Sequence, residues 1–75
     1  MLTNGHSRAR LVAAEAIGIP AEDLTDDAAI GSLEAWDSLA HLRLVMAVEE
    51  TLGRELSTEE AAGLLSFADV QRLLG

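Results

Sequence analysis

The sequence predicts an all-α fold, a four-helix bundle with a long loop between its first two helices and a short third helix. Apolar residues recur at helical spacing in several segments, and no segment shows the alternation of a strand. Helix start and stop residues divide the chain into four such segments. A length of 75 residues allows one hydrophobic core. We therefore expect residues 1–75 to form a single domain, with residues 1–6 flexible.

The first helix is expected over residues 7–17. Its apolar positions are Leu11, Val12, Ala14 and Ile17. Gly18 and Pro20 end it, because glycine tolerates a left-handed cap and proline cannot continue the hydrogen-bond ladder. The connection from Pro20 to Asp37 is long for so small a domain, and such loops usually have a function. Three apolar residues, Leu24, Ile30 and Leu33, are expected to pin it to the core. Trp36 is expected to form a lid over its junction with the next helix.

The second helix is expected over residues 38–52 and ends at Gly53. At 100° per residue it carries two apolar stripes on roughly opposite faces. One stripe consists of Leu44, Val48 and Leu52, with Val45 beside it. The other consists of Leu39, Leu42 and Met46. A small bundle covers only one of them well, so we expect the first stripe in the core and the second on a partner surface.

The last two helices are predicted from their start residues. Ser57 and Glu60 form a capping-box pattern that begins a short helix ending near residue 63 or 64. The segment Ser66-Phe67-Ala68-Asp69 begins the final helix. Its inward-facing residues are expected to be Phe67, Val70, Leu73 and Leu74.

Charge and composition exclude several classes of function. A formal net charge of -8 disfavours binding to DNA or RNA and favours a partner with a basic face, which Glu49 and Glu50 could help to guide. The chain has no cysteine, and Asp26-Asp27 lacks the spaced ligands of a calcium loop, so no metal site is expected. No apolar run is long enough to cross a membrane. We expect a soluble, cytoplasmic monomer.

Three segments in order resemble one known family. Asp37-Ser38-Leu39 opens the second helix, Leu44-Val45-Met46-Ala47-Val48-Glu49-Glu50 forms its second half, and Ser57-Thr58-Glu59-Glu60-Ala61 begins the short helix. In a small acidic chain, this combination over residues 36–74 resembles the acyl carrier proteins, which are phosphopantetheine-binding carriers of the freestanding type. The first helix and the long loop match that family in order and length.

The resemblance implies a role for each matching residue. Ser38 would carry 4'-phosphopantetheine, derived from coenzyme A, and Asp37 would help a phosphopantetheinyl transferase and its magnesium ion to engage the site. Partner enzymes would contact Leu39, Leu42, Arg43, Met46, Glu49 and Glu50. These partners would be the transferase, an acyl- or aminoacyl-loading ligase, and downstream biosynthetic enzymes. Val45 and Val48 would border the space in which an attached chain can shelter. The protein itself would not be an enzyme.

A separate physical argument also points to Ser38. A thioester carrier needs a thiol, and a chain without cysteine must obtain it from a prosthetic group. The start of a helix suits a phosphodiester, because free backbone N–H groups and the helix dipole favour an anion there. The alternative is that Asp37 or Ser38 is only an N-cap. His41 suggests a hydrolase, but adjacent Asp and Ser side chains point about 100° apart on a helix, which disfavours a triad.

Two departures from the family pattern affect the expected cargo. Ala40, His41 and Arg43 stand where fatty-acid carriers often have acidic residues, and Trp36 stands where they tend to have a smaller one. Both differences are similar to those of standalone carriers in specialised pathways. An aminoacyl or peptidyl carrier and a non-catalytic helical interaction module remain the alternatives.

Overall fold

The computed structural model describes residues 7–74, and within that range it is helical, with two isolated β-bridges and no strand. The helices are α1 (Arg8–Ile17), the 3₁₀ helix η1 (Ala21–Asp23), α2 (Ser38–Leu52), α3 (Thr58–Ala62) and α4 (Phe67–Leu74). The predicted all-α bundle with a long first connection and a short third helix is therefore confirmed. The expected flexibility of residues 1–6 lies outside the described residues.

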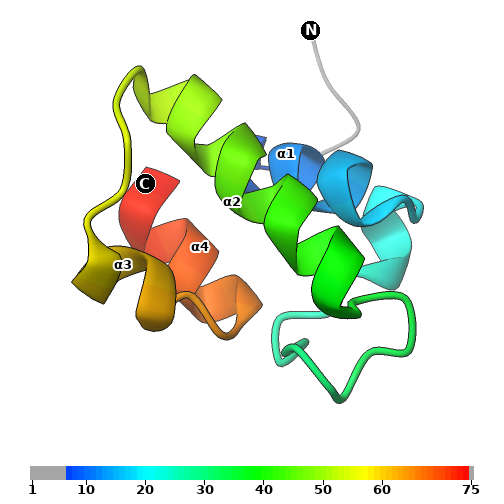
Figure 1. The fold of residues 1–75 in the computed structure, drawn as a ribbon. Coiled ribbons are helices and arrows are strands. Elements are labelled where there is room, and N and C mark those ends of the chain that lie inside the picture. Colours follow the sequence, from blue (N-terminus) through cyan, green and yellow to red (C-terminus); the bar gives the residue numbers. More distant parts are fainter. Residues whose placement is uncertain (1–6, 75) are drawn as a thin grey trace, which may run out of the picture.

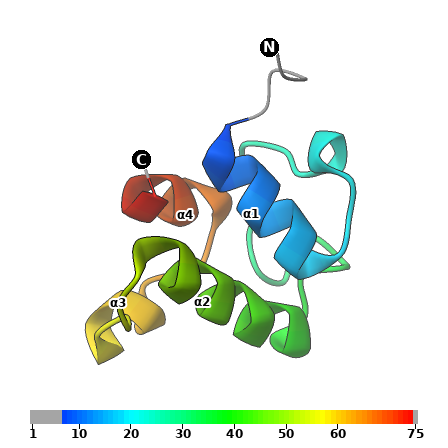
Figure 2. The same ribbon diagram turned by 90° about the horizontal axis from the view of Figure 1, so that it is seen from above.

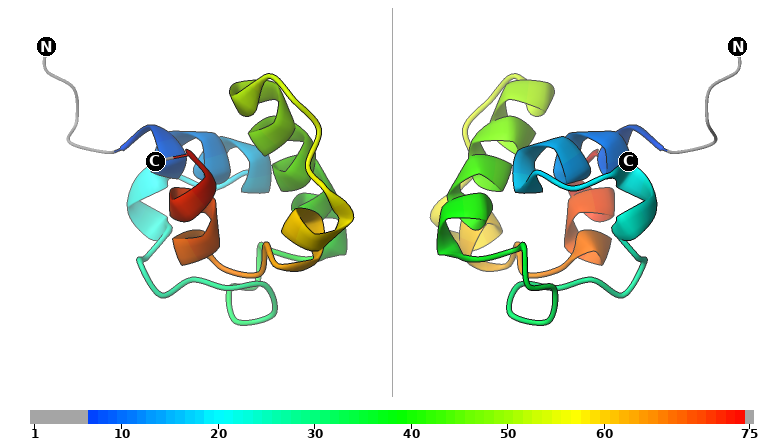
Figure 3. Two further views of the ribbon diagram at one scale, coloured as in Figure 1. Left: turned by 90° about the vertical axis from the view of Figure 1, so that its left-hand side faces the viewer. Right: turned by 90° about the vertical axis from the view of Figure 1, so that its right-hand side faces the viewer.

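Helices α1, α2 and α4 pack against one another and enclose the core. Figures 1 and 2 show α2 crossing α1, with α4 on the same side of α2 as α1 and α3 at the edge of the bundle. The connection between η1 and α2 runs along the lower end of the molecule in both views of Figure 3. That connection leads directly into the start of α2, so the first turn of α2 lies at the margin of the bundle.

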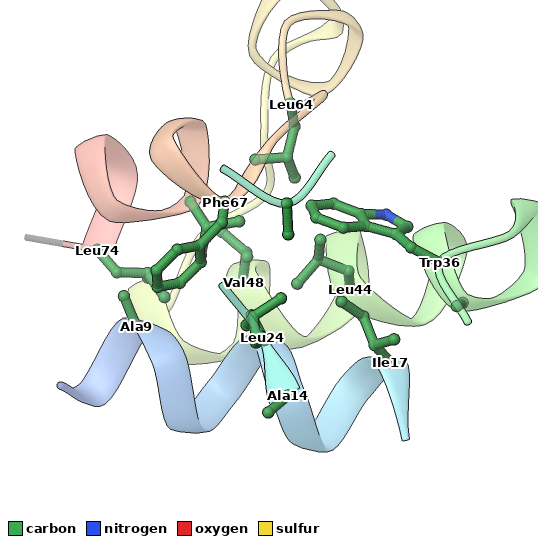
Figure 4. Close-up of a cluster of buried hydrophobic side chains, with 14 residues drawn as sticks. Ala9, Ala14, Ile17, Leu24, Trp36, Leu44, Val48, Leu64, Phe67 and Leu74 are labelled. Atoms are coloured by element: carbon green, nitrogen blue, oxygen red, sulfur yellow. The ribbon is translucent and has the colours of Figure 1, made fainter. Parts of the chain in front are cut away.

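The core combines residues of α1, α2 and α4 with residues of the connections (Figure 4). Its largest fully buried side chains are Trp36, Phe67, Leu24, Leu44, Leu64, Val48 and Val70. Trp36 is only 1% exposed, so the expected lid is in fact a core residue. On α1 the buried face consists of Ala9, Ala13, Ala14 and Ile17. Leu11 is 42% exposed, because at 100° per residue it lies about 200° around the helix from the buried Ala9 and Ala13.

The long connection is more ordered than its sequence suggests. Backbone N–H groups of Ile30 and Phe67 donate to the carbonyl oxygens of Leu65 and Ala28, at 3.0 and 2.9 Å, and tie the connection to the start of α4. Leu24 is fully buried, and Ile30 and Leu33 pack partly buried against the core, as predicted.

Arg10 of α1 holds a second part of this connection. Its guanidinium donates to the Leu24 carbonyl oxygen and to the Asp26 carboxylate, and lies 4.6 Å from the centroid of the Phe67 ring. Arg10 therefore links α1, the connection and α4. Because the connection is held at Leu24–Asp26 and again at Ala28–Ile30, it can deliver the residues before α2 to a defined place.

The helix ends follow the local signals in the sequence. Gly18 and Gly53 close α1 and α2 in the left-handed conformation, with φ of 93° and 75°. Ser57 and Glu60 form the predicted capping box at α3. The Arg54 guanidinium donates to the Glu60 carboxylate at 2.9 and 3.0 Å, and this contact, with the Ser57 N–H, lowers the pKa of Glu60 to about 2. Helix α4 buries Phe67, Val70 and Leu74, with Leu73 partly buried.

Candidate functional site

Ser38 is the first residue of α2 and is exposed to solvent. No other residue in the described range 7–74 forms a hydrogen bond with its side-chain oxygen. Figure 1 shows that the start of α2 follows directly on the long connection and lies at the end of α2 remote from α3. A hydroxyl in this position is accessible to a second protein that transfers a group to it.

Asp37, not Ser38, is the N-cap of α2. Its Oδ1 accepts from the Ala40 N–H at 2.9 Å, and its carbonyl oxygen accepts from the His41 N–H at 2.8 Å. The N–H groups of Ser38 and Leu39 belong to the first turn, where an α-helix supplies no acceptor. A phosphate on the Ser38 oxygen would therefore lie beside free N–H donors at the positive end of the helix dipole.

The alternative interpretation, that Asp37 or Ser38 is only a helix cap, holds for just one of the two residues. Asp37 caps the helix and Ser38 does not, so the hydroxyl of Ser38 is left without a structural task among the described residues. The remaining surface of the Asp37 side chain is exposed beside it. The capping role of Asp37 and a functional role of Ser38 are thus compatible.

Trp36 and His41 form a contact across the start of α2 that sequence reasoning missed. The Trp36 indole Nε1–H donates to His41 Nδ1 at 3.1 Å. The centroids of the two rings are 6.3 Å apart and their planes 24° apart, as a bond between ring edges requires. Trp36 and His41 are five residues apart in the sequence, but no local signal predicts that the indole turns inward. This pair holds the residues on either side of Ser38 in a fixed relation.

The two apolar stripes of α2 face as predicted. Ala40, Leu44 and Val48 are buried, and Val45 and Leu52 pack partly buried against the core. On the opposite face Leu39 and Leu42 are each 57% exposed and Met46 is 60% exposed. These three residues, called the exposed stripe below, begin directly after Ser38. An apolar surface of this kind next to an exposed hydroxyl is typical of a docking site.

The charged residues expected at this face differ in their environments. Glu50 is exposed, whereas the Glu49 carboxylate accepts from the Leu56 N–H at 2.9 Å and fixes the connection to α3. Arg43 is exposed and borders two surface hollows of about 300 and 430 Å³, the larger lying between α1 and α2. Four of the five arginines bind acceptors within the chain, and Arg43 donates to none of residues 7–74.

Within residues 7–74, no group of three or more His, Asp or Glu side chains is arranged to hold a metal ion. No helix in this part of the chain is long and apolar enough to cross a membrane.

Comparison with known proteins agrees with this geometry. A family model described as "Phosphopantetheine attachment site" matches residues 8–74. A protein named acyl carrier protein from Saccharopolyspora erythraea is 33% identical over 66 residues, which are 88% of this chain and 70% of that relative. The chain belongs to the phosphopantetheine-binding carrier protein family. The expected resemblance is confirmed, and the cofactor of the family is covalently attached 4'-phosphopantetheine.

The first turn of α2 fits the cofactor of this carrier family. An exposed hydroxyl, uncapped N–H groups and a helix dipole converge on one point, and no described side chain covers it. Carrier proteins of this family interact with phosphopantetheinyl transferases and with biosynthetic enzymes. Such proteins are generally non-catalytic.

Proposed function

We propose that this protein is an acyl carrier protein in a specialised biosynthetic pathway and that Ser38 carries its phosphopantetheine. The observation that carries the proposal is the exposed Ser38 hydroxyl, which is the first residue of α2 and is released from capping by Asp37. The position of Ser38 within the motif Asp37-Ser38-Leu39 supports the assignment. The relative named acyl carrier protein favours an acyl cargo over an aminoacyl or peptidyl one.

The attachment step follows from the chemistry of the hydroxyl. The Ser38 oxygen forms a bond to the phosphorus next to the pantetheine of coenzyme A, and the pyrophosphate bond of coenzyme A breaks. Adenosine 3',5'-bisphosphate leaves, and the hydroxyl proton passes to a base of the transferase or to water. When bound, the arm supplies the thiol on which the cargo is held as a thioester. In the chain itself, the N–H groups of Ser38 and Leu39 stabilise the new phosphodiester.

We infer that the chain has no hydrolase activity of its own. A triad would need Asp37 to hold the Nδ1–H of His41. In the structure His41 Nδ1 accepts from Trp36, and the Asp37 Oδ1 accepts from the Ala40 N–H. Because its Nδ1 accepts from Trp36 and does not donate to Asp37, His41 lacks the arrangement that a triad base needs.

Intact-protein mass spectrometry tests the proposal directly. After incubation with coenzyme A and a promiscuous phosphopantetheinyl transferase, the protein should gain the mass of one phosphopantetheine. A protein that stays unmodified under conditions in which a second carrier is modified would contradict it, and would favour a non-catalytic interaction module.

The exposed stripe is the proposed contact for the transferase, the loading ligase and downstream enzymes. Leu39, Leu42 and Met46 supply its apolar centre, and Arg43 and Glu50 lie along one edge. The net charge of -8 should attract partners with basic faces over about 8–10 Å at ordinary ionic strength. Arg43 is the exception in this surface, so its native partner should present a carboxylate there or tolerate a cation.

Replacing Arg43 by glutamate should change partner preference. Loading by enzymes that read an acidic second helix should become faster, and loading by the native enzyme slower, each by about three- to tenfold, because one exposed charge contact is worth about 0.2–1 kcal/mol and a reversal turns attraction into repulsion. The measurement is a loading rate for each enzyme with wild type and variant.

The matched control is Arg72→Glu, which changes the net charge by the same amount on α4, away from the exposed stripe. It should leave the ratio of the two loading rates unchanged. If Arg43→Glu also leaves that ratio unchanged, Arg43 is an ordinary solvated residue, and the specialised-pathway assignment loses that support.

A further inference from the structure

The hydrogen bond between Trp36 and His41 determines which nitrogen of His41 carries a hydrogen. An indole N–H can only donate, so His41 Nδ1, 3.1 Å away, must accept. An imidazole that accepts at Nδ1 is neutral and carries its hydrogen on Nε2. His41 is therefore held as the tautomer whose free nitrogen is a hydrogen-bond donor.

The imidazole is also held in orientation. Trp36 is 1% exposed and packed in the core, so its indole cannot turn away without leaving the core. Figure 4 shows the indole reaching in from the segment before α2 towards Leu44. The N–H···N bond, with the two ring planes only 24° apart, fixes the orientation of the His41 ring. His41 itself is only half-buried, so its ring remains accessible from outside.

His41 lies one turn after Ser38 on the same helix. Residues three apart are neighbours on a helix surface. Helical side chains lean towards the N-terminus, so a residue covers the turn before its own Cα. For His41 that turn contains Ser38. The helical spacing therefore puts the ring that carries this Nε2–H donor on the turn that begins with Ser38.

From this geometry we infer that His41 is a positioning residue for the cofactor: its Nε2–H donates to a phosphate oxygen of the phosphodiester on Ser38. The inference rests on the proposed attachment at Ser38. The bond adds a side-chain donor to the backbone N–H groups of Ser38 and Leu39. An anion held from the backbone and from one flank of the helix has a preferred orientation, so the first bonds of the arm leave α2 in a defined direction.

A matched pair of variants separates this role from a purely structural one. In His41→Asn the side-chain amide oxygen lies near the place of Nδ1, so it can still accept from Trp36, but nothing replaces Nε2–H. In His41→Gln the amide nitrogen lies near the place of Nε2, so it can still donate to the phosphate, but the acceptor for Trp36 is lost. His41→Ala lacks both groups and gives the reference for complete loss.

The experiment uses the wild type and each variant after modification with coenzyme A and a transferase. Two nuclear magnetic resonance signals are compared: the ³¹P resonance of the phosphodiester and the indole N–H resonance of Trp36, the one tryptophan of the chain. We expect the ³¹P resonance of His41→Gln to stay near that of wild type and that of His41→Asn to move to the position of His41→Ala. The indole resonance should show the opposite order.

Other results would overturn the inference. If the ³¹P resonance of His41→Asn coincides with that of wild type, His41 serves only as the acceptor for Trp36. If the ³¹P resonance follows the indole resonance in all variants, His41 acts on the site only through Trp36. A wild type that takes up no phosphopantetheine would instead overturn the assignment of Ser38 and this inference with it. The mass of each sample distinguishes that failure from the other two.

Discussion

Ser38→Ala should abolish attachment of phosphopantetheine while leaving the fold intact. The substitution removes the one oxygen that the proposed reaction uses. Asp37 keeps its cap bond to the Ala40 N–H, so the start of α2 does not depend on the hydroxyl. An exposed residue without a structural contact usually changes the free energy of unfolding by less than about 0.5 kcal/mol. Intact mass after incubation with coenzyme A and a transferase, together with a thermal melt, measures both effects.

Ser57→Ala provides the matched control. Ser57 also stands at a helix start, but it is the N-cap of α3 and accepts from the Glu60 N–H at 3.0 Å. Its loss should cost about 0.5–2 kcal/mol of stability and leave modification unchanged. We therefore expect Ser38→Ala to lose modification and keep its stability, and Ser57→Ala to lose stability and keep its modification. Modification of Ser38→Ala to the same extent as wild type would refute the assignment of the attachment site.

Leu44→Ala should destabilise the protein by about 2–4 kcal/mol. Leu44 is fully buried among α1, α2 and the connection, and Figure 4 shows it beside Trp36 and Ile17. Truncation leaves a cavity that rigid neighbours fill only in part. A domain of this size has only about 3–5 kcal/mol to lose, so the variant should be close to unfolding at ambient temperature. Urea unfolding followed by circular dichroism gives the change in free energy.

Leu39→Ala, on the same helix, is the control for burial. Leu39 is 57% exposed, so the same chemical change should cost clearly less stability than at Leu44. It should instead slow modification or loading, because Leu39 belongs to the exposed stripe next to Ser38. A loss of stability as large as that at Leu44 would show that the two faces of α2 had been assigned wrongly.

Local sequence signals account for most of what could be predicted about the fold. The bounds of α2 follow from Asp37 as N-cap and Gly53 as left-handed cap, and those of α3 from the Ser57–Glu60 box. The stripes of α2 follow from the helical period alone, because a helix turns by the same angle at every residue. The position of Ser38 at a helix start needed no tertiary information.

The features that sequence reasoning missed depend on contacts between distant segments. The exposure of Leu11 follows from the burial of the opposite, alanine face of α1, and which face is buried depends on the neighbouring helices. The burial of Trp36 depends on the path of the whole connection, which Arg10 and the start of α4 hold in place. The tautomer and the orientation of His41 follow from that burial, so they could not be predicted from the sequence either.

The basic side chains of the chain are all arginines, and this has a chemical consequence for the cargo. A thioester, the proposed form of that cargo, is attacked readily by amines and thiols. The sequence contains neither lysine nor cysteine, and a guanidinium stays protonated at neutral pH and is a poor nucleophile. Arg8, Arg10, Arg54 and Arg72 supply the hydrogen bonds that hold the surface together without adding an amine to it. A loaded arm that folds back onto its own carrier therefore meets no side-chain amine or thiol to which it could lose its acyl group.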